Sequence, residues 1–170
     1  VTPRAAPPAG PGPPPRFHPT RRAPFATSDR SAWKPACYVN DPVFAGGGPV
    51  FLCGGGEGPP RDGSAVAHSV HCNVAVEYRA TTKALMFAVE HRYYGCHNMS
   101  ACPYSDSDPQ PLQWLSSRQA LADLATFHAH AVSTYGLTAA NQGVSFGGSY
   151  PRMPAGWVRG LYPPLFHASL

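Results

Sequence analysis

The sequence has 170 residues, of which 17 are glycine, 21 are proline and only 13% are charged. This length suits one domain, and the longest apolar runs fall well short of the roughly 18 residues that a membrane-spanning helix needs, so we expect no membrane span. The net charge of +4 arises in residues 1–30, which carry five arginines and one aspartate, so we expect no folded basic patch and no nucleic-acid binding.

The first 24 residues contain nine prolines and offer little to a hydrophobic core. A segment of this composition does not offset the entropy lost on ordering. We therefore expect a disordered Pro/Arg-rich arm over residues 1–24 and a globular domain over residues 25–170. The sequence starts with Val1 and shows no apolar region near its start, so no signal peptide is visible.

The domain contains short apolar runs that do not alternate with polar residues. They lie at residues 49–53, 84–89 and 143–146. Continuous runs of this kind are typical of strands covered on both faces of a parallel sheet. Residues 65–80 and 116–135 have helical spacing, and Gly136 is well placed to end the second helix. The alternating order of strands and helices predicts a doubly wound α/β sheet.

A serine follows the third apolar run, within Gly147-Gly148-Ser149-Tyr150-Pro151. A serine on a tight turn between a buried strand and a helix is how a nucleophile elbow presents its hydroxyl. The Tyr150 amide would lie at a helix start, where it can donate a hydrogen bond to an oxyanion. Gly55 or Gly56 could supply a second donor. A glycine-rich turn with a bystander serine is the alternative, because Pro151 stands where the motif has glycine.

The five cysteines show irregular spacing without a C-x-x-C pair, so we expect no zinc site, other metal site or cofactor. Cys96 and Cys102 are close enough in sequence to form a small disulfide loop if geometry allows. That loop would contain Asn98, the first residue of an N-glycosylation sequon. Cys53 is interpreted as an inert buried thiol. The cysteines and the sequon favour a secretory compartment.

Several sequence blocks occur in a fixed order from Phe25 onward. They are C-Y-V-N-D at 37–41, G-P-V-F-L at 48–52, G-G-E-G at 55–58, E-H-R-Y-Y-G at 90–95, Q-A-L-A-D at 119–123 and F-G-G-S-Y at 146–150. With these blocks the chain resembles the N-terminal part of the S28 serine peptidase family. This family includes lysosomal Pro-X carboxypeptidase, dipeptidyl peptidase II and thymus-specific serine protease.

The resemblance implies an α/β-hydrolase fold, here cut after the elbow, and a serine-type exopeptidase that cleaves at or after proline. It further implies peptide substrates, a secreted or lysosomal/vacuolar location and a homodimer. Ser149 would be the nucleophile, with the oxyanion hole formed by Tyr150 and by Gly55 or Gly56. Glu90, His91 and Arg92 would form a supporting network, and His91 is the alternative base.

Some residues depart from the family pattern. Arg152 and Pro154 occupy the start of the helix after the serine, where Arg152 would crowd the pocket or the sheet and Pro154 is tolerated only near the first turn. Beyond Ser149 there is no acidic residue, and the only histidine is His167. We therefore expect a fragment lacking the acid and base of the triad, with its elbow strand at an exposed sheet edge.

The alternative to a peptidase fragment is a catalytically inactive half-hydrolase, acting as a pseudoenzyme or an interaction module. Another α/β hydrolase, such as an esterase or lipase, is a third hypothesis. The E-H-R-Y-Y-G block argues against this third interpretation.

Overall fold

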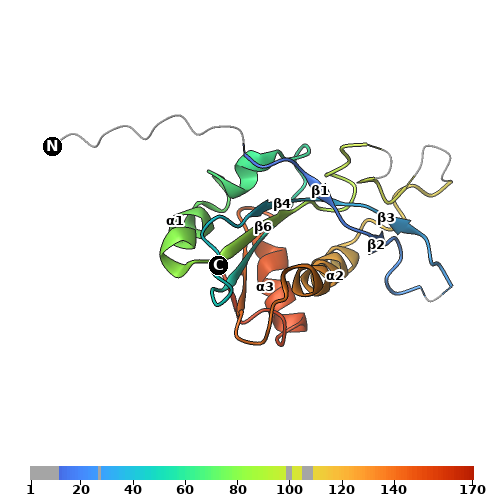
Figure 1. Cartoon of the computed structure of the whole chain (residues 1–170). Coiled ribbons are helices and arrows are strands. Elements are labelled where there is room, and N and C mark those ends of the chain that lie inside the picture. The colour runs from blue at the N-terminus through green and yellow to red at the C-terminus, as the bar shows by residue number, and fades with distance from the viewer. Residues whose placement is uncertain (1–11, 27, 99–100, 105–108) are drawn as a thin grey trace.

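The computed structural model describes residues 12–26, 28–98, 101–104 and 109–170. Its main sheet has six strands in the order β1-β4-β6-β5-β7-β8, and β2 pairs with β3 in a small second sheet (Figure 1). The strands are β1 (Arg16–Phe17), β2 (Thr20–Arg21), β3 (Ala32–Trp33), β4 (Ala36–Asn40), β5 (Val50–Gly54), β6 (Leu85–Val89), β7 (Gly143–Phe146) and β8 (Ala168–Ser169). The helices are the 3-10 helix η1 (Gly63–Val66), α1 (Asn73–Thr82), α2 (Ser117–Tyr135) and α3 (Arg152–Leu161).

The centre of the main sheet is parallel, whereas one side is antiparallel. Strand β5 pairs in parallel with both β6 and β7, and β7 pairs in parallel with β8. Strand β4 joins β6 antiparallel, and β1 joins β4 antiparallel. The expected α/β class is therefore confirmed in its coarse form, as a mixed, parallel-rich sheet with helices.

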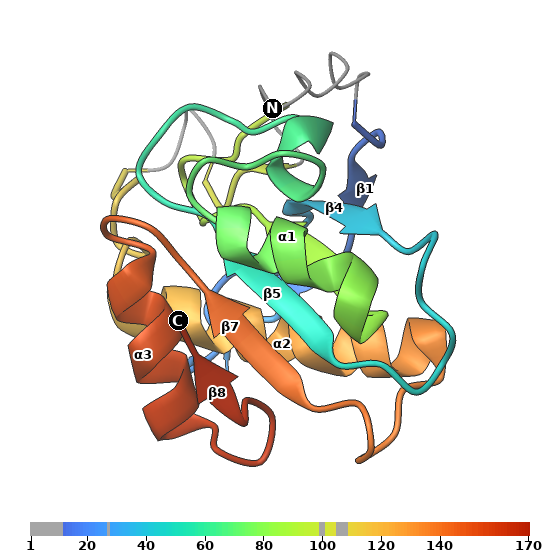
Figure 2. The same cartoon turned by 90° about the vertical axis from the view of Figure 1, so that its left-hand side faces the viewer.

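Helices cover both faces of the sheet (Figure 2). Each face has its own apolar core. On one face, side chains such as Leu52 and Phe87 pack against Phe127 of α2 and Val158 of α3. On the other face, residues such as Phe51 pack against η1 and α1. Strands β5 and β6 are buried along their whole length, which explains their continuous apolar sequences.

The helix predicted over 116–135 forms as expected. Ser116 is its N-cap and accepts a hydrogen bond from the Gln119 amide at 3.3 Å. Gly136 ends it with a φ of 62°, a conformation that glycine adopts readily. The helix predicted over 65–80 instead forms as two elements, η1 and α1. The Asp62 side chain caps η1, and Cys72 is the N-cap residue of α1.

Residues 12–24 differ from the predicted disordered arm. Strand β1 pairs with β4, and β2 pairs with β3, so backbone hydrogen bonding orders a segment that has few apolar residues. His18 is fully buried against Phe127, with ring centroids 4.8 Å apart. Residues 12–24 are thus held by backbone pairing and by the buried imidazole ring of His18, which packs on Phe127 of α2. Residues 1–11 lie outside the described part.

The elbow strand is also less exposed than expected. Strand β8 pairs with Val144 and Ser145 of β7 and covers the edge that the sequence had suggested would be bare. The two residues of β8, Ala168 and Ser169, belong to no apolar run, so the sequence alone did not indicate this strand.

Within the residues that the structure describes, no helix combines the length and apolarity needed to cross a bilayer.

Candidate functional site

Ser149 lies on the turn between β7 and α3, and it is exposed. Its φ is 60°, in the left-handed region that residues with a side chain seldom adopt. A Cβ placed on Gly147 would lie 2.2 Å from the carbonyl oxygen of Pro151. The strand and the helix therefore approach so closely that only glycine fits at this position, and the turn holds Ser149 in a strained, outward-facing conformation.

The glycine-rich loop after β5 lies against this turn. A Cβ placed on Gly56 would lie 2.7 Å from Cγ of Pro151. The Gly55 amide donates to the Val89 carbonyl at 2.7 Å, so it is committed to the sheet. By contrast, across the described ranges neither the Gly56 nor the Tyr150 amide has an acceptor. Of the predicted donors, Gly56 and Tyr150 are thus the two that are available to a ligand.

The loop and the turn enclose a cavity of about 370 Å³, here called the serine cavity. Its lining residues are Gly56, Glu57, Gly58, Pro59, Arg61, His71, Glu90, Gly148, Ser149 and Pro151. His71 is a member that our sequence analysis missed, because no spacing motif marks it. It packs on Gly148, where an added Cβ would lie only 3.1 Å from Nδ1 of His71. The structure thus brings an imidazole and the Ser149 hydroxyl into one cavity.

A disulfide closes the segment that supplies much of this cavity's lining. Cys53 at the end of β5 is bonded to Cys72 at the start of α1, so the interpretation of Cys53 as an inert thiol is wrong. The partners are 19 residues apart, and sequence spacing alone does not reveal such a pairing. Cys96 is bonded to Cys102. Buried Cys37 has no disulfide partner, and burial raises the pKa of its thiol to about 11.

Asn98 lies within the loop closed by Cys96 and Cys102, but the other two residues of its sequon, Met99 and Ser100, are outside the described residues. Glycosylation at Asn98 stays a prediction.

Glu90 directly follows β6 and is buried at the wall of the serine cavity. Its Oε1 accepts a hydrogen bond from the Arg61 amide and lies 3.5 Å from Nε2 of His97. Burial raises the pKa of this carboxyl, whereas the Arg61 amide and guanidinium act in the opposite direction. The Arg61 side chain in turn donates to the Gly54 carbonyl at 2.8 Å. Glu90 and Arg61 together brace the loop that carries Gly56.

His91 faces the opposite side of the elbow. Its Nε2 lies 3.1 Å from the Tyr150 hydroxyl, and its Nδ1 lies 2.7 Å from the Arg92 carbonyl. Burial lowers the pKa of His91, so the neutral ring is favoured. Both ring nitrogens are therefore engaged, Nδ1 by the Arg92 carbonyl and Nε2 by the Tyr150 hydroxyl. His91 does not line the serine cavity but a neighbouring one with Glu57, Tyr94 and Tyr150.

Arg92 is fully buried and anchors α2 to the strand end. Its guanidinium binds both carboxylate oxygens of Asp123, at 2.8 and 2.7 Å, and donates to the Trp114 carbonyl at 2.7 Å. Burial raises the pKa of Asp123 to about 6 against the lowering effect of Arg92. The E-H-R block thus places three charged or polar side chains at the end of β6 with distinct partners, none of which is Ser149.

The remaining candidate residues lie away from the Ser149 hydroxyl. The His167 amide donates to the Gly143 carbonyl, which is at the start of β7, whereas Ser149 follows its end. Arg152 is exposed and does not line the serine cavity, so it causes no crowding there. Pro154 is the third residue of α3, within the first turn, where its missing amide hydrogen interrupts no helical hydrogen bond. Arg152 therefore does not crowd the cavity as predicted, and Pro154 lies in the first turn, where a proline is tolerated.

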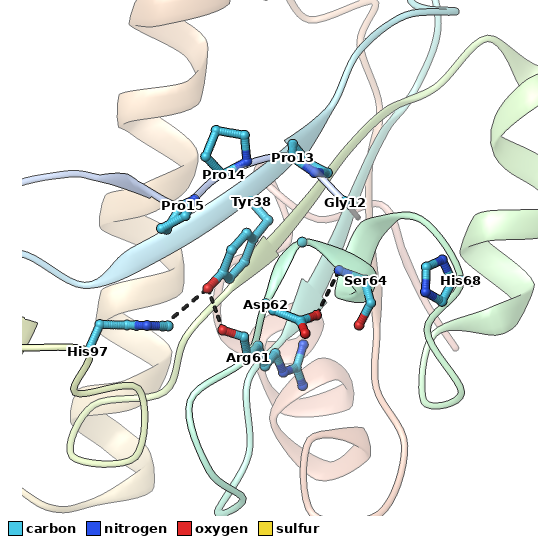
Figure 3. Close-up of a pocket in the computed structure, with 11 residues that line it drawn as sticks. Gly12, Pro13, Pro14, Pro15, Tyr38, Arg61, Asp62, Ser64, His68 and His97 are labelled. Carbon is cyan, nitrogen blue, oxygen red and sulfur yellow. Dashed lines mark hydrogen bonds between the residues drawn. The ribbon is translucent and has the colours of Figure 1, made fainter. Parts of the chain in front are cut away.

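A second cavity, of about 460 Å³, also has Arg61 among its lining residues (Figure 3). Tyr38 points into it, with its hydroxyl 3.2 Å from Nε2 of His97, and the row Pro13–Pro15 forms one wall. His68 lines this cavity and not the serine cavity. In the part of the chain described, no group of three or more His, Cys, Asp or Glu residues is arranged to hold a metal ion.

Residues 21–170 match the family model described as serine carboxypeptidase S28. The chain is 34% identical to the thymus-specific serine protease of Homo sapiens over 148 residues, which are 86% of this chain and 27% of that protein. It is 37% identical to the lysosomal Pro-X carboxypeptidase of Mus musculus over 91 residues, which are 52% of this chain and 18% of that protein. The chain thus spans about a quarter, or less, of the length of these relatives.

Proposed function

Because the chain belongs to the serine carboxypeptidase S28 family, we propose that it carries the nucleophile and the oxyanion hole of a serine-type peptidase built on the α/β-hydrolase fold. In this proposal Ser149 attacks the carbonyl carbon of a peptide bond. The observation that carries it is the φ of 60° at Ser149, on a β7–α3 turn so tight that a Cβ at Gly147 would overlap the Pro151 carbonyl. Strain of this kind is retained where a function requires it.

The amides of Gly56 and Tyr150 are the proposed oxyanion-hole donors. Neither has an acceptor among the described residues, and they belong to the two segments that meet at Pro151. Oriented backbone donors stabilise the negative charge of a tetrahedral intermediate, and one such donor contributes about 10²–10³-fold to the rate in known hydrolases. Gly55 is not a donor in this proposal, because its amide is bound to the Val89 carbonyl.

The substrates proposed are peptides, as the names of the serine protease and carboxypeptidase relatives suggest, and cleavage at or after proline is the proposed preference. A secreted or lysosomal compartment is supported by two disulfides, since such bonds persist in oxidising compartments. A homodimer is a further proposal, which size-exclusion chromatography with light scattering tests directly.

Labelling with a fluorophosphonate probe tests the proposed nucleophile. We expect covalent labelling of the folded chain that mass spectrometry maps to Ser149 and that Ser149→Ala abolishes. The control is Ser145→Ala, since Ser145 is buried and its hydroxyl donates to the Ala155 carbonyl at 2.9 Å. If the folded protein is not labelled at Ser149, the chain is a non-catalytic member and the proposal is wrong. Hydrolysis of a nitrophenyl ester without any action on proline-containing peptides would contradict the proposed preference.

A further inference from the structure

Glu57 borders two cavities at once. It lines the serine cavity with Ser149, and it also lines a neighbouring cavity of about 380 Å³ with His91, Tyr94 and Tyr150. We call this neighbour the tyrosine cavity, and its lining is completed by Leu115, Ser116 and Ser117. Among the described residues no other side chain is shared by the two linings, so Glu57 stands at the boundary between them.

Aromatic rings form much of the lining of the tyrosine cavity. The His91 ring lies 5.4 Å from the Tyr94 ring and 5.5 Å from the Tyr150 ring, measured between centroids. Nε2 of His91 is 3.1 Å from the Tyr150 hydroxyl, and this contact holds the phenol ring in place. The face of a tyrosine ring is electron-rich and attracts a cation. The cavity thus suits a ligand that has a positive charge on an apolar body.

The Glu57 carboxylate has no cationic partner in the described parts of the chain. There it makes no hydrogen bond and no ion pair, and the residue is exposed. Three arginines line these cavities or adjoin lining residues in the sequence, and each contacts a group outside the tyrosine cavity: Arg61 the Gly54 carbonyl, Arg92 the Asp123 carboxylate and Arg118 the Phe25 ring. An unpaired carboxylate beside tyrosine rings is an arrangement that binds an ammonium group.

The electrostatics of the cavity also favour a cation over an anion. Burial raises the pKa of Tyr150, and the charge of Glu57 raises it further. Burial lowers the pKa of His91, and the lining contains no lysine or arginine. The start of α2 lines the cavity as well and attracts negative groups, but a carboxylate bound there would share the cavity with Glu57, and like charges repel.

We propose that the tyrosine cavity binds a primary ammonium group, which pairs with the Glu57 carboxylate between the rings of Tyr94 and Tyr150. In a peptide this group is either the amino terminus or a lysine side chain close to the scissile bond. As a statement about substrates the inference rests on the proposed function, because it takes Ser149 as the place where the peptide reacts. The binding step needs no nucleophile and no base, so it can be measured on this chain by itself.

Nuclear magnetic resonance titration of the full chain measures this binding through the amide signals of Gly56 and Tyr150. The probes are alanyl-prolinamide, its N-acetylated form and Nα-acetyl-lysinamide. None of them has a carboxylate; the first carries its ammonium at the amino terminus, the third carries it on a side chain, and the acetylated form has none. We expect at least one of the two amines to bind about tenfold more tightly than the acetylated probe, as a charge-assisted contact provides. The tighter amine identifies the source of the ammonium.

Two variants and a pH series separate ion pairing from a structural effect. Glu57→Gln should bind the amine as weakly as the acetylated probe. Glu77→Gln is the matched control, because Glu77 is exposed on α1 and lines neither cavity, and it should keep the preference. An amino terminus loses its proton above about pH 8, so any preference for alanyl-prolinamide should fade by about pH 9.5. A merely structural role of Glu57 would change the binding of all three probes alike.

The inference and the proposed function can fail separately. If neither amine binds more tightly than the acetylated probe, or if Glu57→Gln keeps the preference, the inference is wrong even where the fluorophosphonate labels Ser149. If the preference is found but Ser149 of the folded chain is not labelled, the ammonium site stands, and its assignment to a substrate falls with the proposed nucleophile.

Discussion

Replacing Gly147 with alanine tests the tightness of the β7–α3 turn. The added Cβ would lie 2.2 Å from the oxygen and 2.3 Å from the carbon of the Pro151 carbonyl. These are backbone atoms, which cannot rotate away as the end of a flexible side chain could. Overpacking costs about 1–3 kcal/mol, and we expect a value near 3 kcal/mol for this variant. In a chain of this size that loss corresponds to a fall of about 6–12 °C in Tm.

The free energy of unfolding is measured by urea titration with circular dichroism, and Tm by a thermal scan. The matched control is Gly156→Ala in the middle of α3, where a Cβ meets no atom within 4 Å. There alanine should stabilise the protein by about 0.5–1 kcal/mol, because glycine is a poor helix residue. A Gly147→Ala variant as stable as the unchanged chain would refute the close strand–helix approach on which the strained Ser149 depends.

Three further predictions concern groups away from Ser149. Asp123→Ala leaves the Arg92 guanidinium buried without its carboxylate, so urea titration should show a loss of about 3–5 kcal/mol in unfolding free energy. Burial lowers the pKa of His18 to about 3 from 6.5, so only the unfolded chain takes up its proton as the pH falls below 6.5. Its stabilising contribution is complete well above pH 6.5 and declines down to about pH 3. Between pH 6.5 and 4.5 the unchanged chain should lose about 2 kcal/mol more unfolding free energy than His18→Leu in parallel urea titrations, and equal losses would contradict this. Replacing both Cys53 and Cys72 with alanine should lower the unfolding free energy by about 3 kcal/mol, and the thermal midpoint of that variant should depend less on added dithiol reductant than the midpoint of the unchanged chain.

The sequence predicted the elements whose patterns match their burial. Strands β5 and β6 appear as uninterrupted apolar runs, and β7 as a short run interrupted only by Ser145, because helices cover both faces of the sheet. The sequence bounded helix α2 to within one residue, since Ser116 caps its start and Gly136 adopts the left-handed conformation at its end. In each of these cases local chemistry and tertiary environment agree, and so a pattern in the sequence is sufficient.

The elements that were missed depend on partners far away in the chain. Strand β4 contains polar residues and is antiparallel, and β1 is a two-residue strand that exists because β4 is beside it. His18 reads as a polar residue in a proline-rich arm, but it is buried beside Phe127 and stacked on His130. Propensity and composition carry no information on such contacts, which only the assembled sheet and α2 create.

The site divides in the same way. Ser149, Gly147 and the glycine loop could be predicted, because a tight turn and close backbone approach demand particular residue types at fixed offsets. His71 could not be predicted, because its place depends on the Cys53–Cys72 bond and on the absence of a side chain at Gly148. Nothing in the local sequence distinguishes it from an exposed histidine such as His68.

One covalently closed segment accounts for most of the serine cavity. The Cys53–Cys72 bond joins the ends of residues 53–72, and this segment supplies Gly56, Glu57 and His71 to the cavity. The opposite wall is the β7–α3 turn, which the segment touches at Pro151 and Gly148. Because the Gly56 amide, the Glu57 carboxylate and the His71 imidazole are all carried by this one tethered loop, a change in the loop should alter all three together. The strained serine, by contrast, is set by the sheet and α3, so its conformation should survive changes that displace the loop.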